Sequence, residues 1–319
     1  MLVQLRNGDL RAFDESRKIL TLGDNMTKKE LAELRKQCRH KAEIPLLIIA
    51  TVISIAILSI IVYYGTIMKV TPEVIKSFSI FIGSDEKMAE FLLGGREFIA
   101  AIVIVILLGR FIWALYRDNG KARAWETPIT DRQFRPVYDI CCEYAQKLGI
   151  EKKDIPDFFV GDSNSIKINK MDFYNLRSVR IRPAVLRNAL KNDGIEIRYK
   201  VAKAIASVFL GYRSFTCVLL LTITDWIPFF HSMIERTMCY STDRVLQVLM
   251  GEEAAEKAIM NEQISFYLYS DIDYDVYFED ITNFSGFSIF LENLLSGTPI
   301  PRYRIAAIKD PEKKDGRLF

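Results

Sequence analysis

A helix predicted over residues 195–210 carries two side chains that could do chemistry together. Lys203 and Ser207 lie four residues apart, so a helix places them on one face. A lysine beside a serine can form a Ser–Lys dyad, but nucleophilic catalysis also needs an oxyanion site and a lysine of depressed pKa. The spacing supplies neither requirement. We therefore expect a repacked pocket here and not a catalytic dyad.

A second set of side chains, between residues 231 and 243, could bind a metal ion. His231 and Cys239 are eight residues apart, and Asp243 follows four residues later. Imidazole, thiolate and carboxylate are all ligands of zinc, but this spacing matches no zinc motif. We expect His231 to be a hydrogen-bonded or interfacial side chain, and we expect no metal and no cofactor in this chain.

The composition narrows the classes of function. The 319 residues are enough for a membrane anchor and one sizeable domain. A formal charge of +3 does not suggest a nucleic-acid-binding protein. The five cysteines form no C-x-x-C pair and are expected to be reduced thiols in a reducing compartment. The chain has only two histidines, although histidine is the commonest metal ligand and general base.

Two apolar stretches are long enough to cross a lipid bilayer. Residues 44–68 contain no charged side chain, and residues 98–116 contain only Arg110. About 20 apolar residues span the hydrocarbon core, so both stretches are predicted transmembrane helices. A third stretch, 214–234, contains Asp225 and Pro228 near its middle. It is expected to be a buried helix or a membrane-dipping hairpin and not a clean crossing.

The flanking charges predict the orientation of the two spans. Basic residues precede the first span and follow the second, whereas in the loop 69–97 four basic residues are offset by five acidic ones. The positive-inside rule then places both termini in the cytoplasm and the loop on the extracytoplasmic side. The sequence therefore indicates an integral membrane protein with both termini in the cytoplasm; a bacterial inner (plasma) membrane is the location expected from the family resemblance given below.

The remaining sequence is expected to be cytoplasmic. Residues 1–43 predict a hairpin that turns at Asn7-Gly8 and a helix that opens with a capping box of Thr27 and Glu30. Residues 117–310 predict one α+β domain, followed by a tail over 311–319. Its expected helices and strands cover residues 131–149 (helix), 157–161 (strand), 178–182 (strand), 183–191 (helix), 195–210 (helix) and 236–261 (helix).

The strand predicted over 178–182 has the features of a sheet edge. Two arginines project from one of its faces, and charge on an edge strand discourages aggregation. Its residues are Ser178, Val179, Arg180, Ile181 and Arg182. We regard this strand as the candidate partner-binding segment, because an exposed edge can add an extended peptide through backbone groups alone.

Five phrases between residues 144 and 308 occur in the order found in one protein family. They are "YAQKLGI" (144–150), "IPDFFVG" (155–161), "VRIRPAVLRNAL" (179–190), "CYSTDRVLQVLMG" (239–251) and "GTPIPRYRIAAI" (297–308). With the paired membrane segments before them, they resemble the HtpX-like zinc metalloproteases, relatives of the CAAX prenyl proteases. The resemblance implies two N-terminal transmembrane helices and a cytoplasmic, mainly helical metalloprotease-like domain with a small sheet.

The same resemblance implies that the catalytic residues of the family are missing. Aligned through Glu196, the H-E-x-x-H positions for the two zinc ligands and the base fall on Lys203, Ser207 and Ala204. The third ligand falls on Ser241, and the histidine of the family's T-H-P phrase falls on Thr298. Catalytic zinc needs three protein ligands and an activated water needs a base, so the resemblance implies a pseudoprotease.

The absence of the family's catalytic residues favours a non-catalytic function in the membrane. The chain would act as a scaffold or regulator that binds another membrane protein or a protease, with a homo-oligomer as a further form of assembly and the lipid bilayer as its surroundings. Two alternatives stay open. One is an active membrane hydrolase with a non-standard centre, and the other is a subunit of an oligomeric membrane transport assembly.

Overall fold

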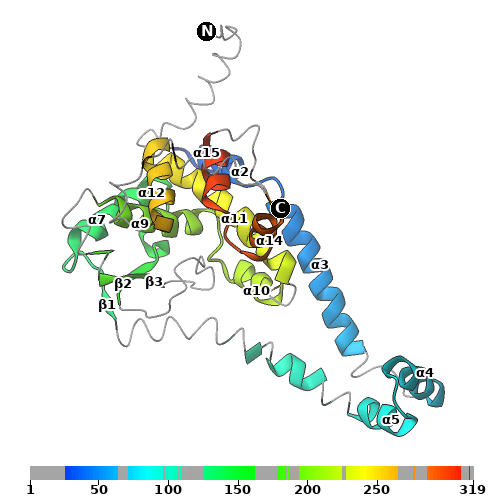
Figure 1. Ribbon diagram of the computed structural model, residues 1–319. Helices are drawn as coiled ribbons and strands as arrows, with labels where there is room; N and C mark the ends of the chain where they lie inside the picture. Colours follow the sequence, from blue (N-terminus) through cyan, green and yellow to red (C-terminus); the bar gives the residue numbers. More distant parts are fainter. Residues whose placement is uncertain are drawn as a thin grey trace.

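The computed structural model describes residues 26–63, 71–95, 98, 100–106, 108–109, 112, 126–161, 178–183, 185–186, 194–224, 228–264, 273, 276, 286–309 and 316. Within these residues the chain is mostly helical, with a small three-stranded sheet. A helical body carries the sheet on one side, and a long helix projects from it toward a helical hairpin at its far end (Figure 1).

The body is built around one central helix, α11 (Pro228–Met250). It contacts helices from both ends of the chain. These are α2 (Lys28–Cys38), α3 (Glu43–Val62), α9 (Ile195–Phe209), α10 (Phe215–Thr224), α12 (Glu252–Ile264), α14 (Phe287–Leu295) and α15 (Pro301–Lys309). The side chains of α11 from Ile234 to Leu246 are buried, so this helix forms the centre of the core.

The single helix predicted over 236–261 is wrong: the structure has two helices there. α11 starts earlier, at Pro228, and ends before Gly251, and α12 follows. Gly251 has a φ of 88°, a left-handed conformation that glycine adopts without the steric cost of a Cβ. The glycine therefore turns the chain, and α12 folds back to contact α9 and α15.

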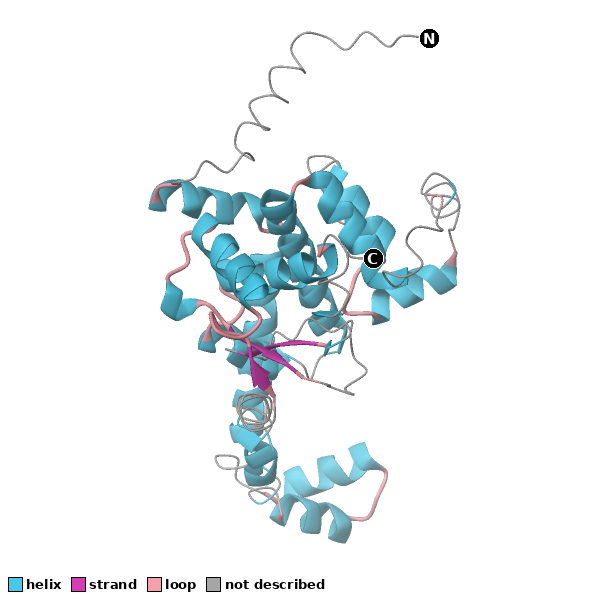
Figure 2. Ribbon diagram, turned by 90° about the vertical axis from the view of Figure 1, so that its left-hand side faces the viewer, coloured by secondary structure: helices cyan, strands magenta, loops and turns pink. Residues whose placement is uncertain are grey.

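The sheet lies against the helical body, as Figure 2 shows. Its strands are β1 (Thr127–Pro128), β2 (Asp157–Val160) and β3 (Ser178–Ile181), in the order β1-β2-β3. β1 is antiparallel and β3 parallel to β2, with Phe158 opposite Val179. Helix α7 (Arg135–Lys147) and the 3₁₀ turn η2 (Lys152–Asp154) lie between β1 and β2 in the chain. Among the strands that the structure describes, β3 thus lies at an edge of the sheet, at the predicted position.

The N-terminal helix has the predicted capping box. The Thr27 hydroxyl accepts a bond from the Glu30 backbone N–H at 3.3 Å, and the Glu30 carboxylate accepts one from the Thr27 backbone N–H at 2.7 Å. These bonds satisfy two of the donors that a helix start leaves open. The predicted hairpin around Asn7-Gly8 lies outside the described residues.

Helix α3 has the length and composition of a membrane span. It has 20 residues, of which an 18-residue window has a mean hydropathy of 2.8, and 17% of that window is buried. In the second predicted span the described residues 98, 100–106, 108–109 and 112 are helical. Because α3 is the one helix in the described part of the chain that meets the length and hydropathy of a span, the two-span arrangement stays a prediction.

The apolar stretch 214–234 is divided between two helices. Its first part forms α10, whose 10 residues rise about 15 Å, half of the hydrocarbon core. Val218 and Leu221 are buried where α10 packs against α3 and α11. Asp225 lies outside the described residues, and the stretch resumes at Pro228 as the start of α11. The described part of the stretch is therefore not one continuous crossing helix.

Candidate functional site

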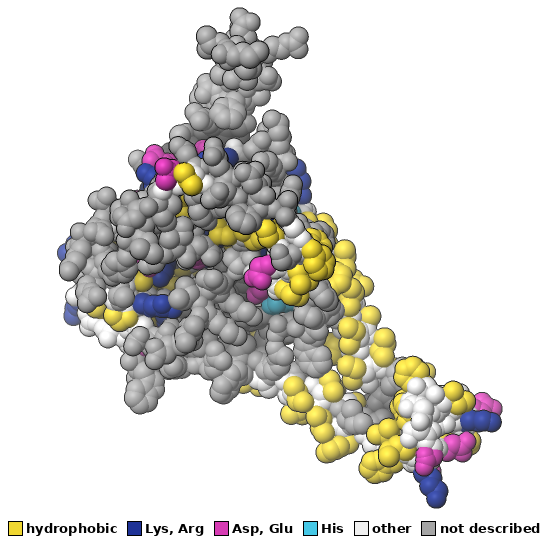
Figure 3. All heavy atoms as spheres, in the orientation of Figure 1, with side chains coloured by type: hydrophobic (Ala, Val, Ile, Leu, Met, Phe, Trp, Pro, Cys, Tyr) yellow, Lys and Arg dark blue, Asp and Glu magenta, His cyan; other side chains and the backbone are white. Residues whose placement is uncertain are grey.

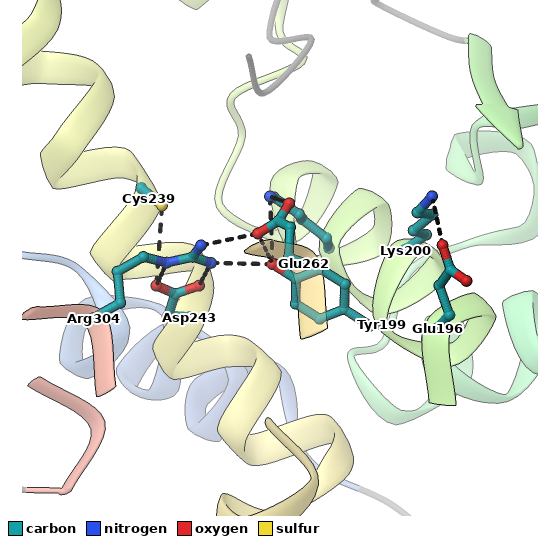
Figure 4. Close-up of polar contacts among 8 residues, drawn as sticks. Glu196, Tyr199, Lys200, Cys239, Asp243, Glu262 and Arg304 are labelled. Atoms are coloured by element: carbon teal, nitrogen blue, oxygen red, sulfur yellow. Dashed lines mark hydrogen bonds and ion pairs between the residues drawn. The ribbon is translucent and has the colours of Figure 1, made fainter. Parts of the chain in front are cut away.

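Four helices converge on a buried network of charged side chains, drawn in Figure 4. Arg304 of α15 donates two bonds to Asp243 of α11, at 2.7 Å from Nε and 2.6 Å from Nη2. Its Nη1 donates to Glu262 of α12 at 2.9 Å. Glu262 also accepts from Lys203 Nζ at 2.7 Å and from the Tyr199 hydroxyl at 2.6 Å, both on α9. The network joins α9, α11, α12 and α15.

The charges of this network compensate one another. The side chains of Arg304 and Asp243 are 0% and 1% exposed, and two cations face two carboxylates. Burial alone raises the pKa of Glu262, but the positive charges of Lys203 and Arg304 outweigh it and hold that pKa below its ordinary value. Burial alone lowers the pKa of Lys203, whereas the Glu262 carboxylate raises it above its ordinary value. Both groups therefore stay charged at neutral pH.

The side chains of this network do not form the zinc site that active members of the resembled family have. Lys203, at the position of the first ligand, is a protonated cation held by Glu262, and it would repel Zn²⁺. Asp243 is a carboxylate, but both of its oxygens already accept bonds from Arg304. Among the described residues there is no group of three or more histidine, cysteine, aspartate or glutamate side chains arranged for a metal ion. The described side chains around Lys203 and Asp243 are therefore not arranged to hold a zinc ion.

Ser241, at the position of the third ligand, belongs to a different cluster. Its hydroxyl donates to the Glu43 carboxylate at 2.5 Å and accepts from the His40 backbone N–H at 2.9 Å. Glu43 is 0% exposed and also accepts from the Tyr212 hydroxyl at 2.7 Å and from Arg39 at 3.0 Å. This cluster, which we name the Glu43 cluster, attaches the first turn of α3 to the body.

Ser207 and Ala204 occupy the remaining positions of the H-E-x-x-H alignment. The Ser207 hydroxyl donates to the Ala204 carbonyl oxygen at 2.6 Å and accepts from Arg213 Nε at 2.8 Å. Lys203 instead reaches Glu262. The structure therefore gives Lys203 and Ser207 separate partners, as expected for a repacked pocket.

His231 is not brought together with Cys239 and Asp243: His231 pairs with Glu235, whereas Cys239 contacts Asp243, which Arg304 holds. The imidazole Nε2 of His231 lies 3.2 Å from the Glu235 carboxylate, one turn further on. The Cys239 thiol lies 3.9 Å from Asp243, and burial raises its pKa to about 12, so it is protonated at neutral pH. A neutral thiol is a poor zinc ligand.

Thr298, at the position of the family's T-H-P histidine, lies in the segment between α14 and α15. Its backbone N–H donates to the Ser296 hydroxyl at 3.3 Å. The same segment approaches α11 closely: a Cβ at Gly297 would overlap a carboxylate oxygen of Glu235. Arg236 of α11 donates to the Ser296 carbonyl at 2.9 Å, next to the end of α14. This segment is therefore bound to α11 through backbone and side-chain contacts.

The candidate partner-binding strand is held to the sheet by an ion pair. Arg180 Nε lies 2.8 Å from the Glu126 carboxylate, and both side chains are mostly buried. Ile181 is fully buried, while Val179 and Arg182 are partly exposed. β3 thus contacts the core through Ile181, and among the described strands its one neighbour is β2, so its other edge is the outer edge of the described sheet.

Sequence reasoning missed six residues of these two clusters: Arg39, Glu43, Tyr199, Tyr212, Glu262 and Arg304. Tyr199 precedes Lys203 by four residues on the same helix, which is the one local signal available. Arg304 lies in the phrase at 297–308 and Asp243 in the phrase at 239–251, so two of the phrases that carry the family resemblance meet in an ion pair. Glu43 stands at the charged start of the first span and had no indication of a distant partner.

Comparison of the chain with protein-family models, with curated proteins and with solved structures finds no match. The family resemblance therefore rests on the quoted phrases alone and stays a prediction.

Proposed function

We propose that this chain is a non-catalytic integral membrane protein, a scaffold or regulator whose metalloprotease-like domain binds another membrane protein or a protease. The observation that carries the proposal is the network of Lys203, Glu262, Arg304 and Asp243. Side chains at or near the family's ligand positions are committed there to ion pairs that join four helices. A metal ion could bind at these positions only after ion pairs of this kind were broken. Breaking one buried ion pair costs about 3–5 kcal/mol.

The edge of β3 supports the binding part of the proposal. Strand addition uses backbone donors and acceptors, so it does not depend on a metal or a base. β3 is fixed at its inner side by Ile181 and by the Arg180–Glu126 pair, which keeps its free edge in one place. An extended segment of the partner would pair with that edge.

The Glu43 cluster supports the membrane part of the proposal. It places the first turn of α3 against α11 through Ser241. If α3 crosses the bilayer, the body lies directly at the membrane surface, where it meets other membrane proteins. We propose that both termini lie in the cytoplasm, from the charges that flank the spans, and that the membrane is a bacterial inner membrane, from the family resemblance.

Metal content tests the non-catalytic part of the proposal. The full chain, purified in mild detergent and dialysed against zinc-containing buffer without chelator, is analysed by atomic emission. We expect less than stoichiometric zinc, with the same content in the wild type and in a Lys203→Met variant. One zinc per chain, retained after gel filtration, would refute the pseudoprotease reading and favour the hydrolase alternative.

Site-specific photo-crosslinking tests the binding part. A photoreactive amino acid replaces Arg182, next to the free edge, or Arg135, which is 77% exposed on α7 and serves as the control. We expect an adduct with one membrane protein or protease from position 182 and not from position 135. That adduct should disappear with Arg180→Pro, which removes an N–H on the side of β3 away from β2, because the next residue, Ile181, bonds to Gly161 on the β2 side. It should persist with Arg180→Ala, which loses the ion pair with Glu126 but keeps that N–H. Equal adducts from both positions, or persistence in the proline variant, would refute strand addition.

A further inference from the structure

The chain between the two predicted spans folds into a helical hairpin, α4 (Pro72–Ile82) and α5 (Glu86–Gly94). The Thr71 hydroxyl accepts from the Val74 backbone N–H at 3.4 Å, and Pro72 opens the helix. α4 ends at Gly83, which has a φ of 63°. The buried side chains of the hairpin, Ser79 and Ala89, are small, so the two helices can approach closely.

The hairpin exposes large apolar side chains. Phe81 at the end of α4 is 85% exposed and Phe91 of α5 is 76% exposed. On α5, Met88, Phe91 and Leu92 follow the i, i+3, i+4 spacing of one helix face, and all three are exposed. Ile80 is also exposed. Such a face on a surface helix is a site of contact with lipid or protein.

The polar side chains lie elsewhere on the hairpin. Glu86 and Glu90 are one turn apart on the opposite face of α5 from Leu92. In Figure 3 the charged side chains of this hairpin gather at its outer end, and hydrophobic side chains lie toward the rest of the molecule. The hairpin is therefore amphipathic, with its charges pointing away from α3.

The apolar face of the hairpin continues the apolar surface of α3. Figure 1 shows the hairpin beyond the end of α3 that is remote from the body. Exposed apolar side chains follow α3 from Ile44 to Val62, and only eight residues separate Val62 from Thr71. A hairpin in this position meets the membrane surface wherever α3 ends.

We propose that this apolar face, formed by Ile80, Phe81, Met88, Phe91 and Leu92, lies in the boundary between lipid headgroups and acyl chains. Lipid is the occupant, in the leaflet at the end of α3 remote from the body. The inference rests on α3 spanning the bilayer and not on the scaffold function. Interfacial helices of this kind bury their apolar face about 5–10 Å into that boundary.

The net negative charge of the hairpin means that its contact with lipid depends on the apolar side chains and not on attraction to anionic headgroups. Between residues 71 and 95 there are four acidic and two basic side chains. They are Glu73, Lys76, Asp85, Glu86, Lys87 and Glu90. A negative hairpin gains nothing from anionic lipids, so zwitterionic phosphatidylcholine is sufficient and added salt should not release the hairpin.

Depth-dependent quenching of a fluorescent label tests the proposal. The full chain carries Phe91→Cys, or the control Glu90→Cys, which lies about 100° around α5 from Phe91, on the side of the acidic residues. Each variant is labelled with the fluorophore NBD and reconstituted at low protein density in phosphatidylcholine vesicles, and the labelled wild type corrects for the partly exposed Cys142 and Cys217. The quenchers are phosphatidylcholine with a doxyl group near the headgroup, and iodide in the water.

We expect the label at position 91 to lose most of its emission to the lipid quencher and little to iodide, with the reverse at position 90, in both low and high salt. Strong iodide quenching at both positions would place the face in water and overturn the proposal. Quenching by neither agent at position 91 would place protein over the face, a second copy or a partner, and would equally overturn it. Loss of the lipid quenching in high salt would contradict an apolar contact.

Discussion

Removing one charge from the buried network should destabilise the body strongly. Glu262→Gln keeps the shape of the side chain but leaves Lys203 and Arg304, whose nitrogens lie 2.7 and 2.9 Å from its oxygens, with Asp243 as the remaining carboxylate. Breaking a buried ion pair by removing one partner costs about 3–5 kcal/mol. At about 2–4 °C per kcal/mol for a domain of 150–250 residues, the midpoint of thermal unfolding should fall by about 6–20 °C.

The assay is thermal unfolding of the full chain in mild detergent, followed by intrinsic fluorescence, with a control on the same helix. Glu253→Gln removes a carboxylate that is 82% exposed and paired with Lys257 at 2.5 Å. An exposed pair is screened by water and contributes little to stability, so this midpoint should stay close to that of the wild type.

A double variant separates charge from packing. Lys203→Met with Glu262→Gln removes one charge of each sign and leaves Arg304 paired with Asp243, so it should recover much of the loss of the single variant. If Glu262→Gln is as mild as the control, the network is not closed to water. If the double variant is worse than the single one, charge balance is not what the network provides, and the reasoning fails.

Three other predictions concern pH and the remaining contacts. Since the pKa of Glu262 is held below its ordinary 4.5 and that of Lys203 above its ordinary 10.5, their contribution is complete between these pH values. It is lost as pH falls below 4.5 or rises above 10.5. In the double variant Lys203→Met with Glu262→Gln, the midpoint of thermal unfolding should therefore depend less on pH in both of these ranges; a pH profile equal to that of the wild type would contradict this. Ser241→Ala leaves part of the Glu43 cluster unsatisfied and should cost about 1–3 kcal/mol in thermal unfolding, a result refuted by a midpoint equal to the wild type. Gly297→Ala should cost about 1–3 kcal/mol by overlap with Glu235, whereas the matched Gly286→Ala, whose Cβ meets no atom within 4 Å, should be close to neutral; equal effects would contradict the close approach.

Local signals were sufficient where one segment decides its own conformation. The capping box of Thr27 and Glu30, the strand at 157–160 and the apolar run of α3 all depend on neighbouring residues, and the structure has each of them. The break at Gly251 also had a local signal, but a helical pattern continued on both sides and concealed it. The hairpin between the spans carried Thr71-Pro72 as a start signal, yet its place between two membrane segments suggested a loop.

The ion-pair network was beyond sequence reasoning for a physical reason. Lys203 and Glu262 are 59 residues apart, and Asp243 and Arg304 are 61 apart. Each is ordinarily a surface residue, and only the packing of four helices makes them buried partners. The alignment could indicate that a lysine stands where a ligand is expected, but not which carboxylate neutralises it.

Stability alone does not explain why this network places four charged side chains in the interior. Buried ion pairs are often no better than apolar side chains of the same volume, because desolvation offsets their attraction. They do fix geometry, since Arg304 and Asp243 bond in a two-pronged arrangement that tolerates little displacement. We therefore interpret the network as setting the positions of α9, α11, α12 and α15.

That interpretation makes a prediction for the partner-binding strand, because α9 packs against β3. A variant with Met at positions 203 and 262 should keep an unfolding midpoint near that of the wild type, yet the photo-crosslink from position 182 should weaken as α9 loses its fixed position. The matched control is Lys257→Met with Glu253→Met, an exposed pair on α12, which should change neither measurement. A full crosslink from the network variant would mean that the charges do not position the strand.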